Sequence, residues 1–166
     1  MISFVSARQR LATAALLLTL ALQCTGCGEK EEPDPPSAAS AIAQGDEICS
    51  EAQAEIDALR DQAPRGPEDA ARLTEGVLAT YEQELADLQA LPVPGDLEDE
   101  LDRYLSARER ALVPLREGLE AARAGDAQAY ARAQAEAAAG QVERTRLARQ
   151  VGFRECSLPA GGAPPG

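Results

Sequence analysis

The sequence has no histidine and no tryptophan, and only two phenylalanines and three tyrosines among its 166 residues. Without histidine there is no Ser-His-Asp triad, no Cys-His dyad and no imidazole metal site. The chain also lacks a glycine-rich phosphate loop, and it lacks the Glu-x-x-His pairs that hold two metals in a helical bundle. We therefore predict that the protein is not an enzyme and that it carries no cofactor or metal.

Basic residues are scarce as well, with 16 Lys and Arg against 28 Asp and Glu and a net charge of -12. Binding to nucleic acid depends on neutralising phosphates with Lys and Arg, so no nucleic-acid partner is expected. The same charge disfavours unaided adhesion to an anionic bilayer. Because aromatic residues are few, the core must consist of Leu, Val, Ile and above all Ala, which implies close helix packing.

The N-terminus reads as a secretory signal peptide. Arg8 and Arg10 form a positively charged start, and residues 11–22 form a twelve-residue run without a charge, which is too short for an ordinary membrane span. The run ends at residues 23–28, which resemble the lipobox of bacterial lipoproteins. In a lipobox, small residues precede a cysteine that is diacylated and becomes the new N-terminus, so the resemblance implies a lipid on Cys27.

The cysteine that receives the lipid has one rival. Thr25 and Gly26 suit the two positions before Cys27, but Cys24 replaces the leucine usual at the third. Cys24 is therefore the alternative acceptor, although Gln23 fits poorly before the cut, and an unlipidated secreted form stays open. We expect an extracytoplasmic protein of the cell envelope that is attached to the membrane through its lipid anchor.

The domain boundaries follow from composition. A signal peptide is expected over 1–26, and residues 27–45 are expected to be the lipidated cysteine and a disordered linker. That linker is acidic and rich in proline, and no hydrophobic face can be drawn on it. A helical bundle is expected over 46–157 and a disordered tail over 158–166.

Four segments carry apolar residues at helical spacing, each with a start signal. The first is expected over about 46–62 with Asp46 as its N-cap. The second opens on Pro67 in its first turn. The third and fourth are expected to stop at Gly125 and Gly152, since glycine commonly follows the last helical residue. No run alternates with a period of two, so no strand is expected.

Short connections make consecutive helices antiparallel neighbours, which predicts an all-α, up-down-up-down four-helix bundle. Asp96 and Asp126 are expected to cap the third and fourth helices, and the first helix should be short. Pro114 lies inside the third helix, where a proline removes a hydrogen bond, so a kink is expected near it. The kink would let the third helix close over the end of the bundle that the first helix does not reach, where Gly118 and Gly140 permit close approach. The alternative is a tolerated proline without a role.

The two cysteines of the domain make this topology testable. In such a bundle the start of the first helix and the end of the fourth meet at one pole, which brings Cys49 and Cys156 together. Removal of the leader and acylation of Cys27 would leave that pair alone, and an exported compartment permits oxidation. We therefore predict a Cys49–Cys156 disulfide that encloses essentially the whole domain.

Tyr81, Tyr104 and Tyr130 fall one on each of the last three helices. Their hydroxyls could line a ligand cavity, although core aromatics with solvated tips are the commoner arrangement. Carboxylate pairs such as Glu82 and Glu84 are typical of bundle surfaces and indicate no site. The acidic run at 96–102 lacks the ligand spacing and turn glycine of an EF-hand loop, so no metal site is predicted there.

Residues 147–156, which follow an Ala-Gly-Asp turn at 124–126, resemble uncharacterised small helical-bundle envelope proteins of GC-rich bacteria. The likeness covers about the last two thirds of the chain and is compositional. It implies a helical bundle, and it transfers no activity and no functional residue.

Together these features predict a lipid-anchored, non-enzymatic helical bundle that acts as a binding, adaptor or structural module at the cell envelope, with an unknown envelope protein as its partner. The alternative is an envelope sensor or carrier that binds a small ligand or cation within the bundle. Cavity volume distinguishes the two, because a solid core favours the adaptor and a tyrosine-lined cavity of a few hundred Å³ favours the ligand binder.

Overall fold

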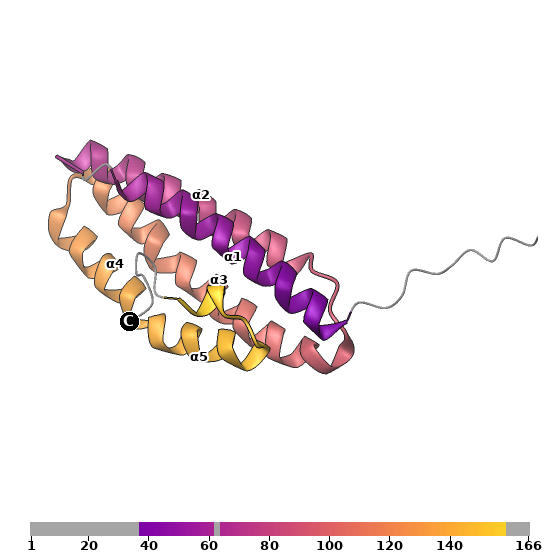
Figure 1. The fold of residues 1–166 in the computed structure, drawn as a ribbon. Helices are drawn as coiled ribbons and strands as arrows, with labels where there is room; N and C mark the ends of the chain where they lie inside the picture. The colour runs from indigo at the N-terminus through magenta and orange to yellow at the C-terminus, as the bar shows by residue number, and fades with distance from the viewer. Residues whose placement is uncertain (1–36, 62–63, 159–166) are drawn as a thin grey trace, which may run out of the picture. The chain divides into compact units, whose positions relative to one another are not determined.

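The computed structural model describes residues 37–61 and 64–158, and within these ranges the chain forms helices and no strand. The elements, labelled in Figure 1, are α1 (Ala38–Arg60), α2 (Pro67–Gln89), α3 (Gly95–Ala124), α4 (Ala127–Ala139), α5 (Gln141–Val151) and the 3-10 helix η1 (Glu155–Ser157). The predicted leader, both candidate lipid acceptors and the tail from residue 159 lie outside the described residues. None of the helices in the described ranges has the length and apolarity of a membrane span.

The predicted four-helix bundle is confirmed, and its fourth member is a bent helix made of α4 and α5 (Figure 1). The central element is α3, which packs against α2 and also against α4 and α5. The first helix, α1, packs on α2 and reaches the fourth helix mainly through η1, because it makes no extensive contact of its own with α4 or α5.

Several predicted helix ends are confirmed. Pro67 occupies the first turn of α2, and the Asp126 carboxylate accepts hydrogen bonds from the backbone N–H groups of Gln128 and Ala129 at the start of α4. Gly125 and Gly152 follow α3 and α5 with positive φ angles of 69° and 104°, the left-handed conformation that glycine adopts most readily. The prediction that Asp96 caps α3 was wrong: the N-cap is Pro94, and Asp96 lies within the first turn.

The first helix is longer than predicted. It begins at Ala38 and not at Asp46, and its N-cap is Ser37, whose hydroxyl accepts a hydrogen bond from the Ser40 N–H at 3.1 Å. Both α1 and α2 contain 23 residues, so the prediction of a short first helix was wrong, as was that of disorder through residue 45. The hydrophobic pattern did not predict helix before Asp46 because the buried face of this first part of α1 consists of small residues, Ala41 and Gly45.

The C-terminal segment explains why that face is small. After α5 the chain turns back along α1, and a Cβ atom at Gly45 would overlap the ring of Phe153. Asp46, which was expected to cap α1, lies inside it and caps η1 instead. Its Oδ1 accepts hydrogen bonds from the backbone N–H groups of Arg154 at 2.8 Å and Glu155 at 3.0 Å. The first part of α1 is therefore a docking face for the end of the domain.

The predicted Cys49–Cys156 disulfide is present, with an S–S distance of 2.05 Å and a Cα–Cα distance of 5.1 Å. Because α1 begins at Ala38, Cys49 lies near the middle of that helix and not in its first turn. The bond therefore joins the middle of α1 to η1, and it helps to hold the C-terminal segment against α1.

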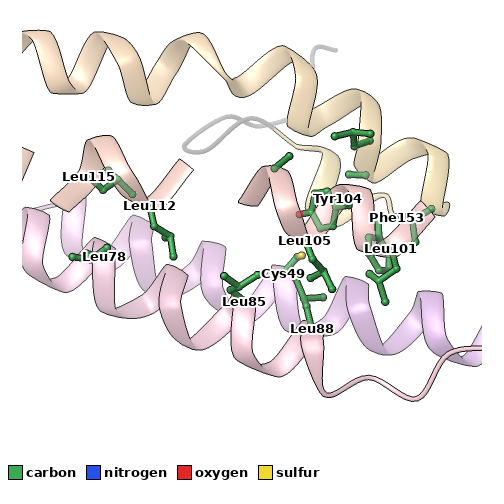
Figure 2. Close-up of a cluster of buried hydrophobic side chains, with 14 of the residues drawn as sticks. Cys49, Leu78, Leu85, Leu88, Leu101, Tyr104, Leu105, Leu112, Leu115 and Phe153 are labelled. Atoms are coloured by element: carbon green, nitrogen blue, oxygen red, sulfur yellow. The ribbon is translucent and has the colours of Figure 1, made fainter. Parts of the chain in front are cut away.

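Apart from two aromatic rings, the core consists mainly of Leu, Val, Ile and Ala, as the composition predicts. The rings of Tyr104 and Phe153 pack edge to face, with centroids 5.7 Å apart, in the part of the core that also holds Cys49 (Figure 2). Helices α3 and α4 approach closely at Gly118, where a Cβ atom would lie 3.4 Å from the Cβ of Ala133.

The fourth helix is interrupted at Gly140, whereas α3 continues through Pro114 as one helix. The kink near Pro114 stays a prediction.

The Arg144 side chain folds back over the interruption of the fourth helix at Gly140: its guanidinium donates a hydrogen bond to the Ala137 carbonyl at 3.1 Å. A Cβ at position 140 would lie 2.5 Å from Nη1 of this arginine. Gly140 therefore leaves the space that the guanidinium occupies.

Candidate functional site

A partly open cavity of about 330 Å³ is lined by residues of α2, α3, α4 and α5, with Arg60 of α1 at its edge. This volume lies at the lower end of the range of small-molecule sites. Its apolar wall comes from α2, α3 and α4 and consists of Leu73, Val77, Ala111, Leu112, Leu115, Ala137 and Ala138. A hollow of about 470 Å³ where α2 begins and α3 ends is more open to solvent and is lined mainly by charged and small residues, so the smaller cavity is the better candidate.

Two of the three predicted tyrosines, Tyr81 and Tyr130, line this cavity. The Tyr130 hydroxyl lies 3.3 Å from the Thr74 hydroxyl, a hydrogen bond that connects α4 to α2 and in which either group can donate. Because each hydroxyl already has the other as its hydrogen-bond partner, a ligand can place apolar atoms at this end of the cavity without leaving either hydroxyl unpaired.

Tyr104 is in a different position from the other two tyrosines. Its side chain is fully buried in the core, it does not line the cavity, and among the described residues its hydroxyl has no hydrogen-bond partner. Burial raises the pKa of this phenol well above its ordinary value, and the nearby positive charge of Arg144 offsets only part of that effect. A buried hydroxyl without a partner destabilises the folded state.

A buried ion pair lies at one end of the cavity. Arg108 of α3 donates a hydrogen bond to Glu84 of α2, and the two side chains are 15% and 4% exposed. The Arg108 guanidinium also lies over the Tyr81 ring, 4.8 Å from its centroid, which is a cation–π contact. Burial lowers the pKa of Arg108 to about 10, so the group stays protonated at neutral pH.

The ion pair separates the cavity from the disulfide. The Glu84 carboxylate oxygen Oε1 lies 3.2 Å from the Cys49 sulfur. A disulfide sulfur carries no proton, so this is a van der Waals contact and not a hydrogen bond. Glu84 does not line the cavity, whereas its partner Arg108 does, and both line a neighbouring hollow of about 20 Å³ together with Arg144.

Arg144 is the second half-buried arginine of the cavity wall. Its guanidinium donates hydrogen bonds to the Ala137 carbonyl and to the Gln141 side-chain oxygen, at 3.1 and 3.0 Å. Both acceptors are neutral, and no carboxylate of the described residues forms an ion pair with Arg144. Burial lowers the pKa of Arg144, and Tyr81 and Tyr104 partly oppose this shift.

The charged residues of the wall are all of one sign. Arg60, Arg108 and Arg144 line the cavity, and none of its described lining residues is Asp or Glu. In a chain with 28 acidic and 16 basic residues this is a marked local reversal of charge. Guanidinium groups and phenols can hold and orient an anion.

None of these charged residues was predicted to belong to a site, and Glu84 was assigned to the surface. The signal was nevertheless present. Arg108 lies four residues after Tyr104 and four before Leu112, and Glu84 lies three after Tyr81 and four before Leu88, so both fall on the inward stripes of their helices. A charge at such a position has to be buried or to border a cavity.

No match emerges when the chain is compared with protein-family models, with curated proteins or with solved structures. Within residues 37–61 and 64–158, no group of three or more Cys, Asp or Glu side chains is placed to hold a metal ion.

Proposed function

We propose that the protein is an extracytoplasmic, lipid-tethered and non-enzymatic binding protein that holds a small ligand in the cavity between α2, α3 and the fourth helix. The observation that carries this proposal is the cavity itself: about 330 Å³, partly open, and lined by Tyr81 and Tyr130 together with an apolar wall. A solid core would have favoured an adaptor, and the cavity supports the ligand binder.

The adaptor function has weaker support. Among the described residues, the large hydrophobic side chains that are strongly exposed are Val113 on α3 and Val142 on α5, at 50% and 82%. Two valines do not form the apolar patch of a few hundred Å² that marks a docking surface. A partner bound through polar contacts remains compatible with the sequence, so the adaptor stays a prediction.

Ligand binding can be tested by filling the cavity. Ala111 is half-buried and lines it, whereas Ala139 is exposed on α4 and does not. We expect Ala111→Trp to abolish binding of a neutral, environment-sensitive fluorophore such as N-phenylnaphthylamine, and the matched Ala139→Trp variant to bind it like the unmodified protein. Circular dichroism of both variants verifies that they fold. Equal binding by the two folded variants would overturn the proposal.

The tether has a separate test. We expect mass spectrometry of the mature protein to find an acylated Cys27 at its N-terminus, and Cys27→Ser to move the protein from the membrane fraction to the soluble fraction. If Cys24→Ser has that effect and Cys27→Ser does not, the acceptor is Cys24. If both variants stay with the membrane, the protein is not tethered by either cysteine.

A further inference from the structure

We propose that the cavity binds a small amphiphile with a carboxylate head group, and that Arg144 holds that head group. This inference rests on the proposed function of the cavity and assigns the chemistry of its ligand.

The sign of the charge on the cavity wall selects an anion. Three arginines line the cavity and no carboxylate does, so a cation would meet repulsion there. The protein as a whole carries a net charge of -12, so an anionic ligand gains nothing from the overall charge. Its binding must therefore come from the positive charge of the cavity wall, where the arginines are partly buried and ionic interactions are screened less by water and salt.

The balance of charges around the three arginines of the cavity wall favours a ligand with a single negative charge. Arg108 already has a buried partner in Glu84, and the two side chains neutralise each other. Arg60 is exposed and lies 4.0 Å from the carboxylate of Asp57. Arg144 has only neutral hydrogen-bond acceptors, and although Glu84 and Glu155 line a small neighbouring hollow with it, its half-buried positive charge has no direct ion-pair partner among the described residues. A monoanion such as a carboxylate balances it.

The geometry of Arg144 also suits this role. The guanidinium has five N–H donors in a planar fork that matches a carboxylate, and the two hydrogen bonds to Ala137 and Gln141 use only part of them. Those bonds, and the space left by Gly140, hold the guanidinium in place before a ligand arrives. A preorganised donor loses little conformational freedom on binding.

The rest of the cavity suits an apolar chain. Since α3 is antiparallel to both α2 and α4, the helical register places Arg108, Tyr81 and Arg144 toward one end of the cavity and Leu115, Leu73 and Tyr130 toward the other. The seven residues from Arg108 to Leu115 correspond to about 10 Å along the α3 axis. A carboxylate with a medium-length alkyl chain fits this polarity and length.

The test compares octanoate, octanol and protonated octylamine by calorimetry on the intact protein. We expect octanoate to bind at least about ten-fold more tightly than octanol, and octylamine not to bind. The Arg144→Gln variant should lose this preference, so that its affinity for octanoate falls to that for octanol. The control is Arg149→Gln, which removes an exposed arginine of the same helix that does not line the cavity and should leave all three affinities unchanged.

A second variant tests the position of the guanidinium without removing it. Gly140→Ala introduces a methyl group where Nη1 of Arg144 lies, and only the flexible end of that side chain has to move. We expect weaker binding of octanoate with no loss of thermal stability. If octanoate and octanol bind equally in the unmodified protein, or if Arg144→Gln leaves their ratio unchanged, the carboxylate assignment is overturned. Binding of the neutral fluorophore and its loss in Ala111→Trp would still stand, so failure of this inference is distinguishable from failure of the proposed function.

Discussion

Glu84 of α2 and Arg108 of α3 form an ion pair that is almost fully buried, between the disulfide and the cavity. A second pair connects the same two helices: Glu82, two residues before Glu84 on α2, pairs with Arg116, more than two turns after Arg108 on α3, but its side chains are 44% and 51% exposed. The two pairs share their chemistry and their helices and differ mainly in burial, which makes each the natural control for the other.

We expect Glu84→Gln to lower the free energy of unfolding by about 3–5 kcal/mol, because it leaves the Arg108 guanidinium buried without a counter-charge. The control Glu82→Gln should cost between about 0 and 1 kcal/mol, since exposed ion pairs contribute little. Urea denaturation followed by circular dichroism measures both values. Equal losses in the two variants would show that burial of the Glu84–Arg108 pair does not increase its contribution to the free energy of unfolding.

Gly45 and Phe153 allow a test of how the C-terminal segment docks. A Cβ at position 45 would overlap the Phe153 ring, so Gly45→Ala forces the ring or the backbone to shift. We expect a loss of about 1–3 kcal/mol in the free energy of unfolding, as is usual for an overpacked core. Gly95→Ala is the control, because nothing lies within 4 Å of a Cβ there, and it should be neutral or slightly stabilising. A neutral Gly45→Ala would contradict the packing of Phe153 on α1.

Reduction of the Cys49–Cys156 disulfide should destabilise the domain strongly. The bond closes a loop with a sequence separation of 107 residues, and the chain-entropy model gives about 4–5 kcal/mol for a loop of that size. Denaturation with and without reductant measures the difference without removing any core atom. Peptide mapping under non-reducing conditions is the check on the bond itself, and free thiols at both positions would rule it out.

Tyr104 gives the protein a specific alkaline sensitivity. Its pKa is raised by burial in the folded state, so above about pH 10 the unfolded chain releases the phenolic proton while the folded chain keeps it. The titration of this group therefore leaves the free energy of unfolding unchanged below that pH and lowers it as the pH rises further. We expect Tyr104→Phe to lack this decline, and to be about 1 kcal/mol more stable at neutral pH because an unpartnered hydroxyl is gone.

Denaturation midpoints of the two proteins, measured at neutral pH and at several alkaline pH values, provide the test. The difference between the variant and the unmodified protein should widen with pH. A constant difference would mean that the phenol titrates equally in the folded and unfolded states, which the burial of Tyr104 contradicts.

The helix ends and the disulfide could be predicted because their determinants are local or topological. Pro67, Asp126 and the glycines at 125 and 152 act on backbone groups within one turn of helix. The pairing of Cys49 with Cys156 was predicted from the order and direction of the helices, although Cys49 lies near the middle of α1 and the chain after α5 turns back along α1 to reach it. Neither inference depended on knowing which side chains meet.

The start of α1 and the candidate site depended on contacts between distant parts of the chain. The face of α1 at Gly45 carries no large side chain because the ring of Phe153, more than 100 residues later, packs against it. In the same way, the state of an arginine on an inward stripe depends on what faces it. Arg108 faces a carboxylate and is neutralised by it, whereas Arg144 has only neutral hydrogen-bond acceptors and no ion-pair partner among the described residues. Local patterns extend over three or four residues, whereas burial and charge balance are set by neighbours from other helices, and only the packed bundle brings those neighbours together.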